Sequence, residues 1–285
     1  MPTGIVTDST CDLPEEIIKQ NNIQVIPLSV SFGEQVFRDN IDLSAEDFYD
    51  KLKEEDTLPG TSQPAVGEFV KLYKKLSTEY ESIISLHLSS NFSGTYDSAR
   101  LAAEQVADCD INVIDTRSVS LGLGFLVLKA AELRDEDYPP EMIIDIINEN
   151  LHNISIYFTV SSLEYLEKGG RIGRGRAFIG SIFNINPILG VCDGEVDPVE
   201  KVRGGNKTYR RIRELMTEEL RGVNEAWVGI LAGKNGEVAG YSRKLYQYLK
   251  DMEKDIRIIS TLPGPAIGTH TGPEIYGTVI FKGIN

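Results

Sequence analysis

Cysteine and histidine are scarce in this sequence, and their scarcity narrows the chemistry that it can carry. The chain has 285 residues, with three cysteines and three histidines. Cys11, Cys109 and Cys192 are far apart and no Cys-x-x-Cys pattern occurs, so neither a disulfide framework nor a zinc ribbon is indicated. His-x-x-His and His-Glu-x-x-His patterns are missing as well. We therefore expect reduced thiols and no bound metal.

Long apolar runs are also missing. No stretch reaches the roughly 20 apolar residues that a membrane-spanning helix needs. The first residues, Met1 to Val6, lack the basic region and the apolar run of a signal peptide. We therefore expect a cytoplasmic protein without an integral membrane segment. Such a protein would have to handle any lipid from solution.

Common enzyme signatures are absent too. The sequence has no Gly-x-Ser-x-Gly elbow of a serine hydrolase, no Walker phosphate loop and no dinucleotide-binding fingerprint. No nucleophile stands near a base in a credible pattern, and no two carboxylates have an obvious catalytic spacing. We therefore predict neither a catalytic residue nor a cofactor.

Positive charge is in short supply. With 29 Lys and Arg against 43 Asp and Glu, the net charge is -14. Phosphates repel such a chain, so a nucleic-acid partner is not expected. The exception is Lys168 to Arg176, which packs four cations among four glycines. Three interpretations fit this segment: a site that binds an anion, a contact to nucleic acid through Arg171, Arg174 and Arg176, or a solvated loop.

What the sequence does contain is a regular alternation of strands and helices. Apolar residues make up 41%, and charged residues 25%, which is typical of a globular protein. Single helices separate four short apolar strands, at Gly4 to Thr7, Gln24 to Val30, Ser82 to Leu88 and Ile111 to Ile114. This order predicts a mostly parallel sheet with helices on both faces. After residue 152 the pattern changes, so we predict two α/β domains, 1–152 with the parallel sheet and 153–285 with a mixed sheet.

Four turns rich in hydroxyl groups stand directly before predicted helices. They are Thr7 to Thr10, Thr61-Ser62, Ser93 to Thr95 and Asp115 to Ser118. In a parallel sheet, turns after strands gather at the carboxyl edge, where free helix N–H groups favour a small anion. Each turn could instead be an ordinary helix cap. Gly94 favours a ligand at its turn, because glycine lets the backbone come close.

Two other segments have both a functional and a structural interpretation. Gly268 to Pro273 places His270 between threonines in a turn-rich segment. That histidine would either pair with an acidic ligand or serve as a structural group. Ala177 to Leu189 is apolar but too short to span a membrane. It would form either ordinary core or the wall of a hydrophobic tunnel.

Five segments taken together resemble the DegV family. They are Ile5 to Pro14, Thr61 to Pro64, Ser93 to Tyr96, Gly170 to Gly173 and Gly268 to Pro273. They follow the family order and span nearly the entire chain. The resemblance implies a two-domain α/β fold with a long-chain fatty acid between or within the domains. It also implies a non-catalytic carrier, the fatty-acid-binding subunit of a bacterial fatty acid kinase in phospholipid metabolism.

The resemblance also assigns roles to residues. The carboxylate of the fatty acid would be held by Thr61, Ser62, Ser93, Gly94 and His270. Arg171 would belong to the supporting polar network, and Arg203 would contact the kinase. The acyl tunnel would include Phe178, Ile179, Ile182 and Phe183.

The expected partner is the ATP-binding subunit of the kinase, which makes an acyl phosphate from the delivered acid. Transient membrane contact is compatible with this role. The sequence departs from the family pattern at Glu274, where glycine is usual, and at Ala65, where serine is common. An alternative hypothesis is an enzyme that acts on a small phosphorylated substrate through the same hydroxyl-rich edge.

Overall fold

In the computed structural model, which describes residues 2–55, 57–179, 186–234 and 236–282, the N-terminal strands form a parallel sheet. Its strand order is β2 (Ile23–Ile26), β1 (Thr3–Asp8), β6 (Ser82–His87) and β7 (Asp110–Asp115). Alternate residues of β1 point to opposite faces, so Val6 and Ile5 enter different cores. One face carries α3 (Val66–Leu76) and α4 (Thr95–Ala103). The other carries α1 (Glu15–Gln20), α5 (Leu121–Asp135) and α6 (Pro140–Asn150).

The second sheet is mixed. Its order is β10 (Glu195–Val202), β9 (Asn186–Cys192), β8 (Ile154–Thr159), β13 (Tyr276–Phe281), β11 (Glu225–Ala232) and β12 (Asp255–Thr261). The pair β11–β12 is parallel, and the other pairs are antiparallel. Its outer face is covered by α8 (Gly205–Glu219) and α9 (Gly236–Lys250). The predicted α/β fold, with one parallel and one mixed sheet, is confirmed.

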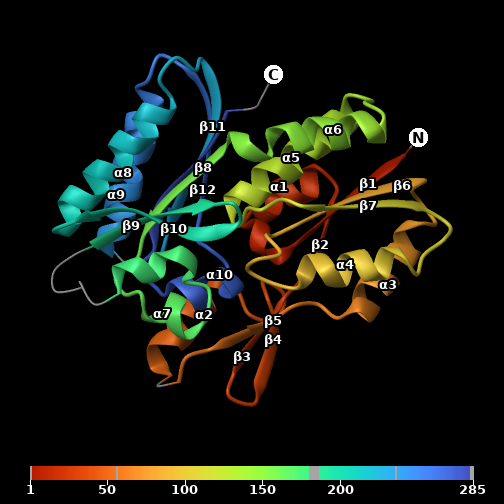
Figure 1. Cartoon of the computed structure of the whole chain (residues 1–285), viewed down its shortest axis with the longest axis horizontal. Coiled ribbons are helices and arrows are strands. Elements are labelled where there is room, and N and C mark those ends of the chain that lie inside the picture. Colours follow the sequence, from red (N-terminus) through yellow and green to blue (C-terminus); the bar gives the residue numbers. More distant parts are fainter. Residues whose placement is uncertain (1, 56, 180–185, 235, 283–285) are drawn as a thin grey trace.

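Helix α5 lies between the two sheets (Figure 1). It contacts β1 and β6 on one side and β8, β11 and β13 on the other. Its side chains are buried on nearly every side, as expected for a helix that is apolar all round. The main core therefore runs from the first sheet through α5 into the second. All strands of the first sheet precede residue 152 and all strands of the second follow it, while the division into two domains stays a prediction.

A small antiparallel sheet was not predicted. It has the order β4 (Gln35–Arg38), β3 (Ser29–Phe32) and β5 (Gly60–Ser62), and α2 (Ala45–Glu54) packs against it. The single strand predicted over Gln24 to Val30 is wrong, because Pro27 separates β2 from β3. Proline lacks the N–H that a strand interior needs. Thr61 and Ser62 lie on β5, which pairs with β3, and not in a turn.

The remaining helices are short: α7 (Glu164–Lys168), α10 (Pro265–Thr271), and the 3-10 segments η1 (Ser9–Cys11), η2 (Leu151–Asn153) and η3 (Gly173–Phe178). Helix α10 replaces the turn expected around His270. Pro265 starts it and Gly272, with φ of 74°, ends it. None of the helices in the described ranges has both the length and the apolar composition of a membrane span.

Candidate functional site

A cavity of about 310 Å³ lies where the carboxyl edge of the first sheet meets the inner face of the second sheet, β5 and α10. Most of its wall is apolar and includes Leu88, Val119, Ile156, Phe158, Leu166, Val191, Val196, Leu231 and Ile275. A group of polar side chains joins this wall: Thr61, Ser62, Gln63, Ser93, Arg171 and His270. The volume is near the lower end of the range for small-molecule sites.

His270 and Thr61 meet in this cavity although they are 209 positions apart in sequence. The last turn of α10 holds the imidazole, and its Nε2 lies 2.8 Å from the Oγ1 of Thr61 on β5. Burial, together with the positive charge of Arg171, lowers the pKa of His270 to about 4. The ring is therefore neutral at pH 7 and carries one N–H.

The second ring nitrogen of His270 has no partner in the described part of the chain. Its Nδ1 is buried, and it lies so close to Gly169 that a Cβ there would stand 2.3 Å away. We assign the ring proton to Nε2, because the Thr61 hydroxyl oxygen can accept a hydrogen bond from it. In that tautomer the imidazole donates to the Thr61 oxygen, and the Thr61 hydroxyl is free to donate its own proton to a ligand.

Arg171 lies in the segment between α7 and η3 and connects two loops beside the cavity. Its Nη1 donates to the carbonyl of Gly169 at 2.6 Å, and its Nε donates to the carbonyl of Phe92 at 2.9 Å. These bonds tie the loop after α7 to the loop after β6. The guanidinium lines the cavity, so it adds a fixed positive charge that favours an anion there.

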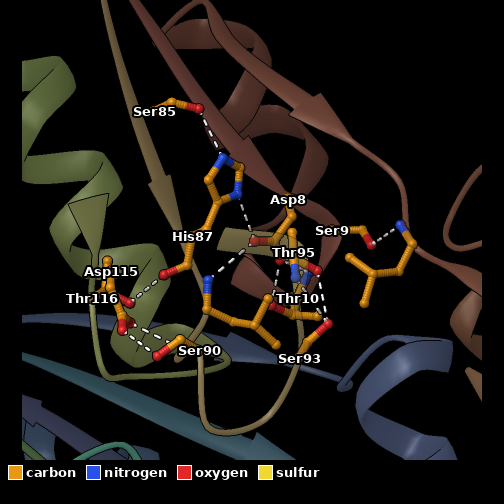
Figure 2. A network of polar contacts seen from close by, with 12 residues as sticks. Asp8, Ser9, Thr10, Ser85, His87, Ser90, Ser93, Thr95, Asp115 and Thr116 are labelled. Atoms are coloured by element: carbon orange, nitrogen blue, oxygen red, sulfur yellow. Dashed lines mark hydrogen bonds and ion pairs between the residues drawn. The ribbon is translucent and has the colours of Figure 1, made fainter. Parts of the chain in front are cut away.

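Ser93 and Gly94 occupy the turn between β6 and α4. The Oγ of Ser93 lies 2.9 Å from the Oγ1 of Thr95 (Figure 2). Gly94 is not among the described residues that line the cavity. A Cβ at Gly94 would stand 2.3 Å from Oε1 of Gln63, whose amide donates to Ser98. The missing side chain thus makes room for Gln63, which does line the cavity.

The other two hydroxyl-rich turns mainly hold the sheet edge together. Both carboxylate oxygens of Asp8 accept hydrogen bonds, from Thr10 and from the backbone N–H of Leu88 (Figure 2). Asp115 accepts from the N–H and the hydroxyl of Ser90. Asp8 caps the 3-10 segment η1, whereas Asp115 joins two loops and caps no helix. Thr10 is the exception in the first of these turns, because it also lines the cavity.

Most of the residues that line the cavity were not predicted as site residues, among them Thr10, Gln63, Phe92 and Ser120. The first two lie inside sequence motifs, so position in a motif could have indicated them. Ser120 follows Asp115 to Ser118 and gives no signal of its own. Its hydroxyl donates to the buried carboxylate of Asp12, a pairing of residues 108 positions apart that sequence spacing does not reveal.

Comparison with known proteins places the chain in a family. The family model described as uncharacterised proteins of the DegV family matches residues 2–283. Protein DegV of Bacillus subtilis (strain 168) is 37% identical over 279 residues, which cover 97% of this chain and 98% of that protein. This chain belongs to the DegV family. The predicted resemblance is confirmed.

Solved structures of DegV proteins share the fold. A protein from Thermus thermophilus, described as a fatty-acid-binding DegV family protein, has a TM-score of 0.92 and 30% identity, with 99% of this chain and 100% of that chain covered. The Bacillus subtilis DegV structure, named as a fatty acid binding protein, has a TM-score of 0.90 and 35% identity, with 99% of each chain covered. A stearic-acid-binding protein from Eubacterium ventriosum has a TM-score of 0.88 and 25% identity, with 100% and 99% covered.

Some site residues predicted from the DegV resemblance lie elsewhere. Phe178 and Ile179 are half-buried and pack against the main core, but they are not among the described residues that line the cavity. Ile182 and Phe183 lie outside the described residues. Arg203 is exposed between β10 and α8. The tunnel and kinase-contact assignments therefore stay predictions.

Two further predictions concern charge and metal near this site. Glu274 follows α10 and is not among the cavity-lining residues of the described chain. In the same part of the chain, no group of three or more His, Cys, Asp or Glu side chains is placed to hold a metal ion. Arg174 forms an ion pair with Asp197 at 2.7 Å, so this cation of the glycine-rich segment is already partnered.

Proposed function

We propose that this chain binds one long-chain fatty acid, with its tail in the apolar part of the cavity and its carboxylate at the polar end. Thr61, Ser62, Ser93, Gly94 and His270 would hold the carboxylate. Arg171 would support them. The observation that carries this proposal is the convergence of Thr61, Ser93 and His270, from three distant segments, on one mostly apolar cavity.

The energetics favour a division of roles between tail and head group. Burial of the tail contributes roughly 0.8 kcal/mol for each methylene, so the tail supplies most of the affinity. Association and ordering costs offset much of this. A hydrogen bond to a charged head group contributes about 1.5–3 kcal/mol. The polar cluster therefore sets the orientation of the acid and avoids an unpaired buried anion.

The chain would then act as a carrier in the cytoplasm. It would present the carboxylate to the ATP-binding subunit of a fatty acid kinase, which forms an acyl phosphate for phospholipid metabolism. Arg203, which is exposed beside the start of α8, would contact the kinase. A carrier needs no nucleophile of its own, because the kinase supplies the phosphoryl-transfer chemistry. The relatives named as fatty-acid-binding proteins support the binding part of this proposal.

The first experiment identifies the ligand. The chain is purified from a bacterial host and extracted with organic solvent, and the extract is analysed by mass spectrometry. We expect one acyl chain for each protein molecule, and rebinding of the same acid after delipidation. Recovery of no acyl chain, together with no binding of any long-chain acid by delipidated protein, would overturn the proposal.

A second experiment separates the binding role from the delivery role. With a partner kinase added, Ser93→Ala is expected to lower both fatty-acid affinity and acyl-phosphate formation. Arg203→Ala is expected to lower acyl-phosphate formation and to leave fatty-acid affinity unchanged. Equal affinity and turnover in the wild type and both variants would contradict the head-group and kinase-contact assignments.

A further inference from the structure

A second cavity of about 160 Å³ lies directly behind the first. Two side chains, Ile156 on β8 and Val191 on β9, line both cavities. They therefore form the partition between the two spaces. Ile156 is 5% exposed and belongs to the main core, and the half-buried Val191 packs against that core.

The partition belongs to the apolar part of the first cavity. The polar cluster of Thr61, Ser62, Gln63, Ser93, Arg171 and His270 comes from β5 and the residue after it, from the loop after β6, from the segment after α7 and from α10. Thr10 on η1 and Ser120 before α5 are further polar residues of the wall. Ile156 and Val191 come from neighbouring strands of the second sheet, among Phe158, Val196 and Leu231. An acyl chain whose carboxylate lies at the polar cluster would extend over these apolar strands.

The second cavity has a different chemical character. Arg117, His152 and Asp193 contribute to its wall beside the apolar Leu151 and Ile154. The two side chains thus separate an apolar space from a partly polar one.

We propose that Ile156 and Val191 form the end wall of the acyl cavity and set the longest fatty acid that it accepts. This inference rests on the proposed function, since it concerns the tail of the same ligand. Loss of both side chains would join the cavities and enlarge the available space by about half. Each further methylene that becomes buried raises affinity roughly fourfold.

The test uses the full chain, delipidated and offered an equimolar mixture of saturated fatty acids of increasing length. Bound acids are extracted and measured by mass spectrometry for the wild type, Ile156→Ala, Val191→Ala and the double variant. Ile156→Val is included as a milder change that removes a single methyl group. Ile188→Ala is the matched control, because Ile188 is buried on β9 but belongs to the core under α8 and α9.

We expect the wild type to show a sharp upper limit of chain length. The limit should move to longer chains in Ile156→Ala and Val191→Ala, and furthest in the double variant. Ile188→Ala should lower the melting temperature without moving the limit. The assignment of Ile156 and Val191 as the end wall would be overturned by either of two results. One is an unchanged chain-length limit in folded Ile156→Ala and Val191→Ala, and the other is an equal shift of that limit in Ile188→Ala. Failure of the wild type to retain any fatty acid would instead overturn the proposed function.

Discussion

The buried His87 and the half-buried His270 differ in how many of their ring nitrogens have hydrogen-bond partners. His87 lies at the end of β6, and both of its ring nitrogens have partners (Figure 2). Its Nδ1 is 2.9 Å from the carboxylate of Asp8, and its Nε2 is 2.8 Å from the hydroxyl of Ser85. Ser85 in turn accepts from the hydroxyl of Tyr73 at 2.8 Å. At His270 one nitrogen has a partner and the other has none among the described residues.

This difference separates a structural network from a binding site. Nearly every buried polar group in a native protein has a hydrogen-bond partner, so an unpartnered one calls for an explanation. The His87 network is complete, and completeness makes such a network rigid. The cluster of His270, Thr61 and Arg171 is incomplete and lines a cavity. We infer that the first serves the fold and that the second binds a ligand through the Thr61 hydroxyl, which the imidazole leaves free to donate.

The largest expected effect tests the structural side of this comparison. Asp8→Ala removes the acceptor for Thr10, Leu88 and His87, all of which are buried. We expect the free energy of unfolding to fall by about 3–5 kcal/mol, because several buried donors lose their acceptor at once. Chemical denaturation measures the change. Asp115→Ala is the control, with an expected loss of about 1 kcal/mol, because it removes the acceptor of exposed hydrogen bonds from Ser90. Equal losses in the two variants would contradict the distinction.

The binding side is tested at His270. His270→Ala removes a single hydrogen bond, so stability should fall by no more than about 1.5 kcal/mol. Fatty-acid affinity should fall by about 1.5–3 kcal/mol, or roughly tenfold to a hundredfold, because the head-group cluster loses a member. Isothermal titration of delipidated protein measures the affinity. His152→Ala, at an exposed position on η2, should change neither quantity. A stability loss at His270 that matches the loss at Asp8 would remove the contrast.

The sequence could predict much of this fold but only part of the site. The strands around Ile5 and Ile84 have apolar centres, Ile5-Val6 and Ile83-Ile84, so their burial in a parallel sheet follows from local pattern. The sheet formed by β3, β4 and β5 was missed because its strands are short. Thr61 joins it through pairing with Val30, a contact that local pattern does not encode.

Site residues were predictable where they lie in motifs and unpredictable where folding alone joins them. Thr61, Ser93 and His270 were assigned from the family resemblance, and the structure brings all three to one cavity. No periodicity could indicate that Ser120 bonds with Asp12, or that Ile156 separates two cavities. Contacts of this kind depend on which sheet faces which, and that is settled by tertiary packing.

A smaller effect concerns the carboxyl group of Asp12. Burial raises its pKa to about 7, although Ser120 and the N–H of Gly264 donate to it. The native state therefore binds this proton more tightly than the unfolded chain, and stability falls as the pH rises from about 4 to about 7. Asp12→Asn removes the buried charge and keeps an acceptor for Gly264. Between pH 5 and pH 8, we expect the free energy of unfolding of the variant to exceed that of the wild type by about 1–2 kcal/mol.

Denaturation curves across this pH range check the prediction. Asp39, whose pKa burial also raises to about 7, stays in the variant and keeps part of the dependence. Ser120→Ala is the control, because it removes a donor and leaves the carboxyl group in place. Identical pH profiles for the wild type and Asp12→Asn would show that Asp12 is not the group that titrates.

The smallest effect contrasts the two histidines directly. The pKa of His270 lies at about 4, below its ordinary value of 6.5, so between these values the unfolded chain binds a proton that the native chain does not. Stability should therefore fall as the pH drops from 6.5 towards 4, opposite in sign to the effect of Asp12. Nitrogen-15 NMR of the imidazole rings should find His270 neutral at pH 6 with its proton on Nε2. Added fatty acid should shift the His270 resonances and leave those of His87 in place, because a completed network has no bond left to offer a ligand. Equal shifts at both rings would mean that the Asp8 network also takes part in binding.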